Sequence, residues 1–168
     1  MTTYDTEGIY TPLSFDDVDL TPLELEVLKR MRAVVEAKGY DYIYPHASDG
    51  DCRYYDIKNV LNPVSQLWEE QVDYAAPACI VGHLLAEMNL GETIDTVTNE
   101  SGIDTIADSV FLDYPPKERT EALKQALVAA QKYQDSGETW GYALMGFEKT
   151  LASWVAKREA EKAKVVTF

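Results

Sequence analysis

Two residues that could bind a metal or act as a nucleophile lie four positions apart near the middle of the chain. Cys79 and His83 belong to the apolar run 77–85, and this spacing puts both on one face of a helix. It also suits a Cys2His2 zinc site, with His46 and Cys52 as the further ligands. The sequence has no C-x-x-C pair, however, and a single Cys in an apolar run is usually a small core residue. The pattern favours packing over zinc and leaves both interpretations open.

Other catalytic motifs are not found in the sequence. There is no glycine-rich phosphate loop, no G-x-S-x-G elbow and no H-E-x-x-H motif. A triad would have to use one of only two histidines, and a reactive thiol needs a polar, partly exposed setting. The apolar surroundings of Cys79 do not provide one, so we expect a non-enzymatic protein without a cofactor.

Tyrosines are frequent in this chain, with eleven in 168 residues. Tyr40, Tyr42 and Tyr44 alternate as on one face of a strand, and Tyr54 and Tyr55 would lie on a facing strand. Exposed tyrosines bring large contact areas at a low entropic cost and are enriched at interfaces. These five residues are therefore the predicted partner-binding surface. The alternative is that this face packs against the helices.

The formal net charge of −14 argues against nucleic-acid binding, which requires a basic surface. It is compatible with a solvated surface, with docking to a basic protein, or with mimicry of DNA phosphates. No stretch reaches the length of a membrane span, so we expect no membrane association. Two cysteines without a secretory signal are typical of a reducing cytoplasm.

The best-marked helix begins after an acidic, aromatic arm at residues 1–20. Thr21 and Glu24 form the pattern of a capping box, Pro22 suits the first helical position, and Gly39 ends the helix. A second helix is predicted from Pro77 to residue 90.

Two glycines have predicted roles, one within this second helix and one directly after it. Gly82 would allow close approach of another backbone, and Gly91 would act as a left-handed stop.

The C-terminal half is predicted to be helical over 103–111, 117–135 and 140–164, with Gly137 ending one helix and Thr139 capping the next. A hairpin is predicted near 40–57, and Asn62-Pro63 is interpreted as a breaker in a loop. The expected fold class is mainly α with a small antiparallel β-element (α+β). It forms one compact helical domain over 21–168 after the arm.

Three segments resemble a known group of sequences. Cys52-Arg53-Tyr54, the run 77–85 and the run 130–144 resemble small uncharacterised proteins of bacteriophages that infect actinobacteria. The shared pattern is C-x-Y, then P-x-C-I-V-G, then Q-D-x-G-x-x-W-G. The resemblance implies a phage origin and a bacterial host cytoplasm, and it implies no reaction.

The matching residues allow two interpretations. Asp135 and Trp140 could converge with Cys52, Cys79 and His83 on one pocket, or the segment around Trp140 could be a purely structural helix–turn–helix corner.

Three functional hypotheses follow. The first is a phage accessory protein that binds a host protein with a basic surface and modulates or inhibits it, in host takeover or anti-defence. The second is a protein that sequesters a small ligand or nucleotide signal, or holds zinc, in the Cys52, Cys79 and His83 region. The third is a minor virion or assembly protein.

Overall fold

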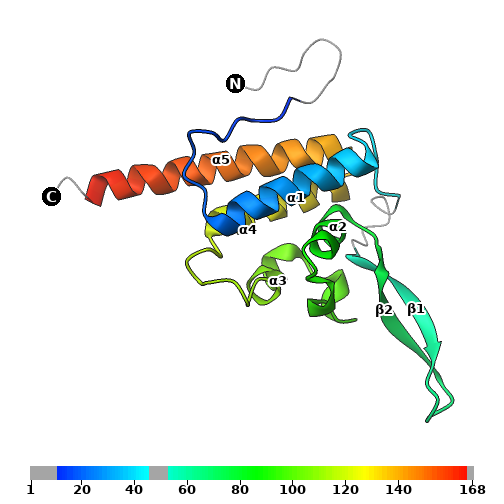
Figure 1. Cartoon of the computed structure of the whole chain (residues 1–168). Helices are drawn as coiled ribbons and strands as arrows, with labels where there is room; N and C mark the ends of the chain where they lie inside the picture. The colour runs from blue at the N-terminus through cyan, green and yellow to red at the C-terminus, as the bar shows by residue number, and fades with distance from the viewer. Residues whose placement is uncertain (1–10, 46–52, 166–168) are drawn as a thin grey trace.

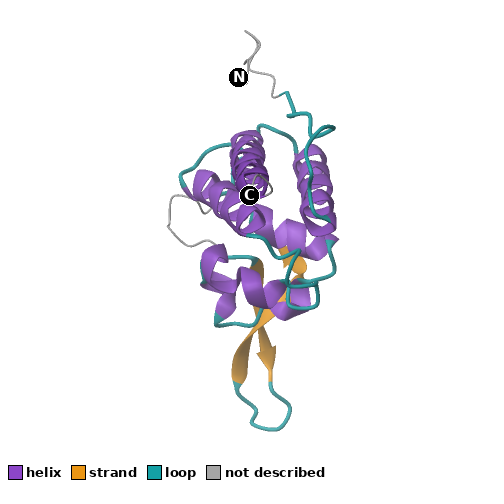
Figure 2. Ribbon diagram, turned by 90° about the vertical axis from the view of Figure 1, so that its left-hand side faces the viewer, coloured by secondary structure: helices purple, strands orange, loops and turns teal. Residues whose placement is uncertain are grey.

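The computed structural model describes residues 11–45 and 53–165 of the chain. Within them, three long helices lie along one another: α1 (Pro22–Lys38), α4 (Glu121–Asp135) and α5 (Trp140–Val165) (Figure 1). Beneath them lie the shorter helices α2 (Ile80–Glu87) and α3 (Ile103–Val110), with 3-10 turns η2 (Gly91–Thr93) and η3 (Thr98–Glu100) between them. A hairpin of β1 (Tyr55–Leu61) and β2 (Trp68–Pro77) projects from this body (Figure 2). The predicted α+β class is confirmed.

Helix α1 begins as its sequence predicts. The hydroxyl of Thr21 accepts the backbone N–H of Glu24 at 3.2 Å, and the Glu24 carboxylate accepts the N–H of Thr21 at 2.8 Å. This reciprocal capping box satisfies two backbone donors that have no partner within the helix. The helix ends at Gly39, whose φ of +100° is easy for glycine alone.

Helices α4 and α5 form an antiparallel pair. Their connection follows the prediction, whereas α4 begins at Glu121, after the N-cap Thr120, and not at residue 117. Gly137 has a φ of +79° in the connection between them, and the hydroxyl of Thr139 accepts the N–H of Tyr142 at 3.3 Å at the start of α5. The buried stripe of α5 supplies much of the core, through Trp140, Leu144, Phe147 and Leu151.

The central helix is shorter than predicted. Pro77 ends β2 instead of starting a helix, and the Cys79 sulfur caps α2 by accepting the N–H of Gly82 at 3.3 Å. The left-handed residue after α2 is Asn89, with a φ of +57°, and not Gly91. Asparagine tolerates this conformation because its side chain can hydrogen-bond locally.

The predicted close approach at Gly82 is confirmed. A Cβ atom at this position would lie 1.8 Å from the carbonyl oxygen of Tyr54. The missing side chain therefore lets the start of β1 lie directly against α2.

The hairpin lies at 55–77, so its predicted position near 40–57 is wrong. Asn62-Pro63, interpreted as a breaker between elements, is part of the turn that joins the strands. The side chain of Asn62 stabilises this turn by accepting the N–H groups of Val64 and Ser65 at 2.9 and 3.1 Å. In residues 40–45, Ile43 forms a single isolated β-bridge with Thr139.

A buried asparagine holds the start of β1 to the body. The Asn99 side chain accepts the N–H of Tyr55 at 2.9 Å and donates to its carbonyl oxygen at 2.8 Å. One side chain thereby performs the pairing that a neighbouring strand would otherwise provide.

Two arginine–glutamate pairs connect α1 with α5 and hold the arm, residues 11–20, against these helices. They are called the first and the second clasp. In the first clasp, Glu148 accepts from Arg32 Nε at 2.7 Å and from the N–H of Leu13 at 2.8 Å, while Arg32 Nη2 donates to the Leu13 carbonyl at 2.6 Å. Both main-chain polar groups of Leu13 are thus engaged.

The second clasp has the opposite arrangement of charges. Arg158 of α5 contacts both carboxylate oxygens of Glu24 in α1, at 2.7 and 3.1 Å, and donates to the Asp19 carbonyl at 2.6 Å. Each helix therefore supplies one arginine and one fully buried glutamate.

Candidate protein interface

The tip of the hairpin exposes large apolar side chains. Val64, Leu67 and Trp68 are 91%, 66% and 70% exposed, and Leu61 is 42% exposed. These four residues are called the tip patch. They lie at the end of the element that projects furthest from the helices (Figure 2). Adjoining exposed apolar side chains on a projection are typical of a protein-binding surface.

The strand register shows why the patch is exposed. Leu61 pairs directly with Trp68, and Ile57 pairs with Val72 four positions nearer the body, so all four side chains lie on one face of the hairpin. At the base this face packs on the core, with Val72 buried and Ile57 half-buried. Further out on the same face, the polar pair of Asn59 and Glu70 separates this base from Leu61 and Trp68, so the tip patch is an apolar surface of its own.

Hydrogen bonds shape the turn that carries the patch. The N–H of Asn62 donates to the Leu67 carbonyl at 2.9 Å, and the side chain of Asn62 donates to Glu69 at 2.6 Å. Gln66 takes a left-handed φ of +57°. These contacts fix the direction of the turn and hold Val64 and Leu67 outward.

The strands that carry the patch are acidic. The two strands contain four acidic residues, Asp56, Glu69, Glu70 and Asp73, and one basic residue, Lys58. Lys58 is engaged with Asp73 at 3.0 Å, and this hydrogen bond lowers the pKa of the Asp73 carboxyl. The surroundings of the patch therefore carry net negative charge, which a basic partner surface would complement.

Three of the five predicted partner-binding tyrosines are buried, which contradicts that role for them. Tyr44 is 3% exposed, and Tyr54 and Tyr55 are 0% exposed. The Tyr54 hydroxyl donates to the Ser101 carbonyl at 2.6 Å, and burial raises the pKa of Tyr55. The alternative interpretation therefore applies to these three. Tyr54 and Tyr55 are covered by α2 and Asn99 at the start of β1.

The other two tyrosines lie where the segment after α1 meets the start of α5. The N–H groups of Trp140 and Gly141 donate to the carbonyls of Tyr42 and Tyr40, each at 2.8 Å. Tyr40 is 38% exposed, and the half-buried Tyr42 ring contacts Trp140 edge-on at 4.7 Å. Lys38 Nζ lies 5.1 Å from the Tyr42 ring centroid, at cation–π distance.

The predicted pocket is only partly assembled. His83 and Trp140 meet edge-on, with ring centroids 5.3 Å apart, whereas Asp135 is exposed at the end of α4. Cys79 and Trp140 are fully buried, and Cys52 lies outside the described residues. Burial, with a smaller effect of Lys38, lowers the pKa of His83 to about 4, so the imidazole is neutral near pH 7.

The zinc prediction is not tested. Among residues 11–45 and 53–165, no group of three or more His, Cys, Asp or Glu side chains could hold a metal ion. Two of the four predicted ligands, His46 and Cys52, lie outside those ranges.

Sequence reasoning missed the tip patch. Its signal was a Leu-Trp pair and a valine next to Asn-Pro, within otherwise polar residues. Asn62-Pro63 is predicted to lie in a loop, and this prediction does not join the apolar residues on its two sides into one surface.

Comparisons with family models, with curated proteins and with solved structures gave no match. The fold and the tip patch define an α+β protein with a projecting hairpin whose tip is apolar. In the part of the chain that the structure describes, no helix is long and apolar enough to cross a membrane.

Proposed function

We propose that this chain is a non-enzymatic binding protein that inserts its hairpin tip into an apolar groove of a partner protein bordered by basic side chains. The observation that carries the proposal is the tip patch, four apolar side chains exposed at the end of a projecting hairpin. Removing such side chains from water is a main source of affinity at protein interfaces, where tryptophan is enriched.

The charge of the hairpin supports the choice of partner. The acidic residues of β1 and β2 and the net charge of −14 would accelerate association with a basic surface and disfavour acidic ones. The resemblance to phage proteins adds an origin to the proposal, in which the partner is a protein of an actinobacterial host and binding modulates or inhibits it.

The test is affinity purification from an actinobacterial lysate with three tagged proteins: the wild type, a Leu61→Ser/Trp68→Ser variant and a Val97→Ser/Leu112→Ser control. Val97 and Leu112 are 79% and 66% exposed and belong to neither strand nor the turn of the hairpin, so the control removes a similar amount of exposed apolar surface. We expect a partner that the wild type and the control retain and the tip variant loses.

The purified partner then allows a direct measurement of affinity. We expect the Trp68→Ser substitution alone to weaken binding by at least about 2 kcal/mol, roughly thirtyfold, with little change in thermal unfolding. A partner that all three proteins retain equally, or no specific partner at all, would contradict the proposal.

A further inference from the structure

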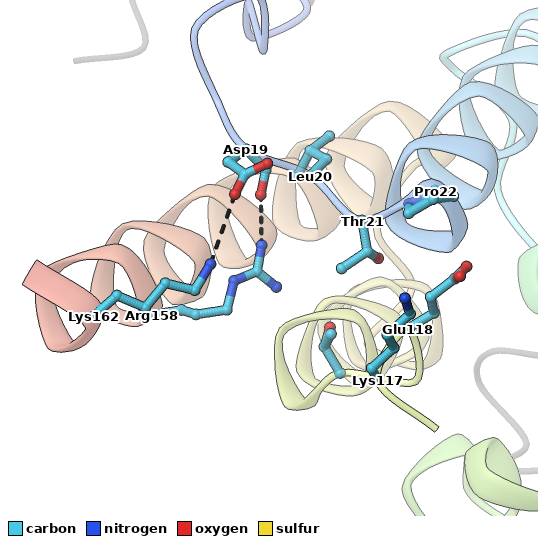
Figure 3. Close-up of a pocket in the computed structure, with 9 residues that line it drawn as sticks. Asp19, Leu20, Thr21, Pro22, Lys117, Glu118, Arg158 and Lys162 are labelled. Carbon is cyan, nitrogen blue, oxygen red and sulfur yellow. Dashed lines mark hydrogen bonds and ion pairs between the residues drawn. The ribbon is translucent and has the colours of Figure 1, made fainter. Parts of the chain in front are cut away.

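A cavity of about 350 Å³ lies at the other end of the helical body from the hairpin (Figures 1 and 3). The end of the arm, the first residues of α1, the segment before α4 and the last turns of α5 form its walls. Its volume is within the range of small-molecule sites, at the lower end of roughly 300–1,000 Å³. It is called the junction pocket.

Two lysines give the pocket cationic groups on different walls. Lys117 precedes α4 and makes no ion pair or hydrogen bond with the rest of the described chain. Lys162 of α5 has its Nζ 2.8 Å from Glu159 and 3.6 Å from Asp19. An ammonium group has three donors, so each lysine retains hydrogen-bonding capacity for a ligand.

The third cation of the pocket has a structural task. Arg158 is engaged with Glu24 and with the Asp19 carbonyl. These bonds fix the pocket wall, because they hold the arm, α1 and α5 together at this point. Figure 3 shows the bond between Arg158 and Asp19. Charge that a ligand could newly neutralise is therefore carried mainly by Lys117, since Lys162 is already paired with Glu159 and Asp19.

The pocket also contains acceptors. The carboxylates of Asp19 and Glu118 line it together with the two lysines. A ligand that is anionic throughout would be repelled by these groups, whereas hydroxyl groups would donate hydrogen bonds to them. The volume also exceeds what one phosphate group needs, which leaves room for a hydroxyl-bearing part.

We propose that the junction pocket binds a small phosphate ester with free hydroxyl groups, its phosphate held by Lys117 and Lys162 and its hydroxyls by Asp19 and Glu118. The proposal is independent of the hairpin interface, since the two sites share no residue.

Ribose 5-phosphate is a suitable probe, with ribose and inorganic phosphate as its two halves. Titration of the full chain at low ionic strength, followed by calorimetry and by amide NMR shifts, should show saturable binding of ribose 5-phosphate. We expect inorganic phosphate to bind at least about tenfold more weakly and ribose not measurably, because each half forms only part of the charge-assisted bonds.

Variants locate the site. Lys117→Gln should weaken binding of ribose 5-phosphate about tenfold or more, through the loss of one charge-assisted bond. The control Lys132→Gln, at an exposed lysine near the other end of α4, should leave it unchanged. Unfolding curves of both variants should match the wild type.

Three results would overturn the proposal. They are no saturable binding of ribose 5-phosphate up to about 10 mM, equal affinity for inorganic phosphate, and equal loss in the Lys117 and Lys132 variants.

Discussion

At the residue scale, the tightest contact in the core is made by a residue without a side chain. Gly82 lies against the main chain of Tyr54, and the N–H of Ala78 donates to that same Tyr54 carbonyl at 2.8 Å. Backbone atoms held by hydrogen bonds cannot move aside as a flexible side chain can. The position therefore accepts only glycine without a shift of β1 or α2.

We expect Gly82→Ala to lower the free energy of unfolding by about 3 kcal/mol, as overpacking against backbone does. Urea denaturation followed by circular dichroism measures this loss. Gly102→Ala is the matched control: its new Cβ would meet only the exposed Asp104 carboxylate, so the loss should stay within about 1 kcal/mol. Equal losses in the two variants would show that the Tyr54 contact is not tight.

His83 gives a second prediction at this scale. The pKa of His83 is about 4 in the folded chain and 6.5 as its ordinary value. Between pH 4 and pH 6.5 the imidazole is therefore protonated in the unfolded state and neutral in the folded state. The contribution of His83 to stability is fully present above pH 6.5 and is lost as the pH falls toward 4.

The measurement is the difference in the free energy of unfolding between the wild type and His83→Gln at several pH values. Between pH 6.5 and 4, we expect the wild type to lose stability relative to the His83→Gln variant. NMR titration of the imidazole should give the low pKa directly. A difference that does not vary with pH would contradict the burial of the neutral ring beside Trp140.

At the scale of elements, the clasps decide whether the arm stays on the body. Arg32→Met would leave the fully buried Glu148 without its cation. We expect a loss of roughly 2–4 kcal/mol in the free energy of unfolding, less than for a fully buried pair because Arg32 is one-third exposed. The amide of Leu13 should also exchange faster with solvent.

The control for the first clasp is Arg30→Met on the same helix. Arg30 is exposed, and its ion pairs to Glu26 and Glu87 are 3.9 and 3.8 Å long, so its loss should be below about 1 kcal/mol. If the amide of Leu13 also exchanged faster in the Arg30→Met variant, the arm would not be held specifically by the first clasp.

The elements also show how far sequence reasoning reaches. The start of α1, the stops at Gly39 and Gly137 and the cap of α5 were predictable because each depends on a few neighbouring residues. The clasps were not, since Leu13 and Glu148 are 135 positions apart. The position of the hairpin was not predictable either, because the start of β1 is held by α2 and by Asn99, 44 positions further along the chain.

At the scale of the whole molecule, the excess of acidic residues has opposite effects on folding and on binding. Within the folded chain, like charges repel, and salt screens this repulsion over a Debye length of about 10 Å at 0.1 M. Between the chain and a basic partner, charges attract, and salt weakens that attraction.

We therefore expect added sodium chloride, from about 0.01 to 0.2 M, to raise the midpoint of thermal unfolding and to slow association with the partner. Scanning calorimetry and stopped-flow association rates measure the two effects. An association rate independent of salt would mean that the apolar tip acts without help from the acidic strands.

The two clasps also make the resistance of the fold to force depend on the direction of pulling. The arm runs parallel to α5, since Leu13 is fastened beside Glu148 and Asp19 beside Arg158. A force that pulls the two ends of the chain apart along this axis would shear both clasps at once. A force on the hairpin would instead peel β1 from α2 one contact at a time, so the same fold should resist the first pull far better than the second.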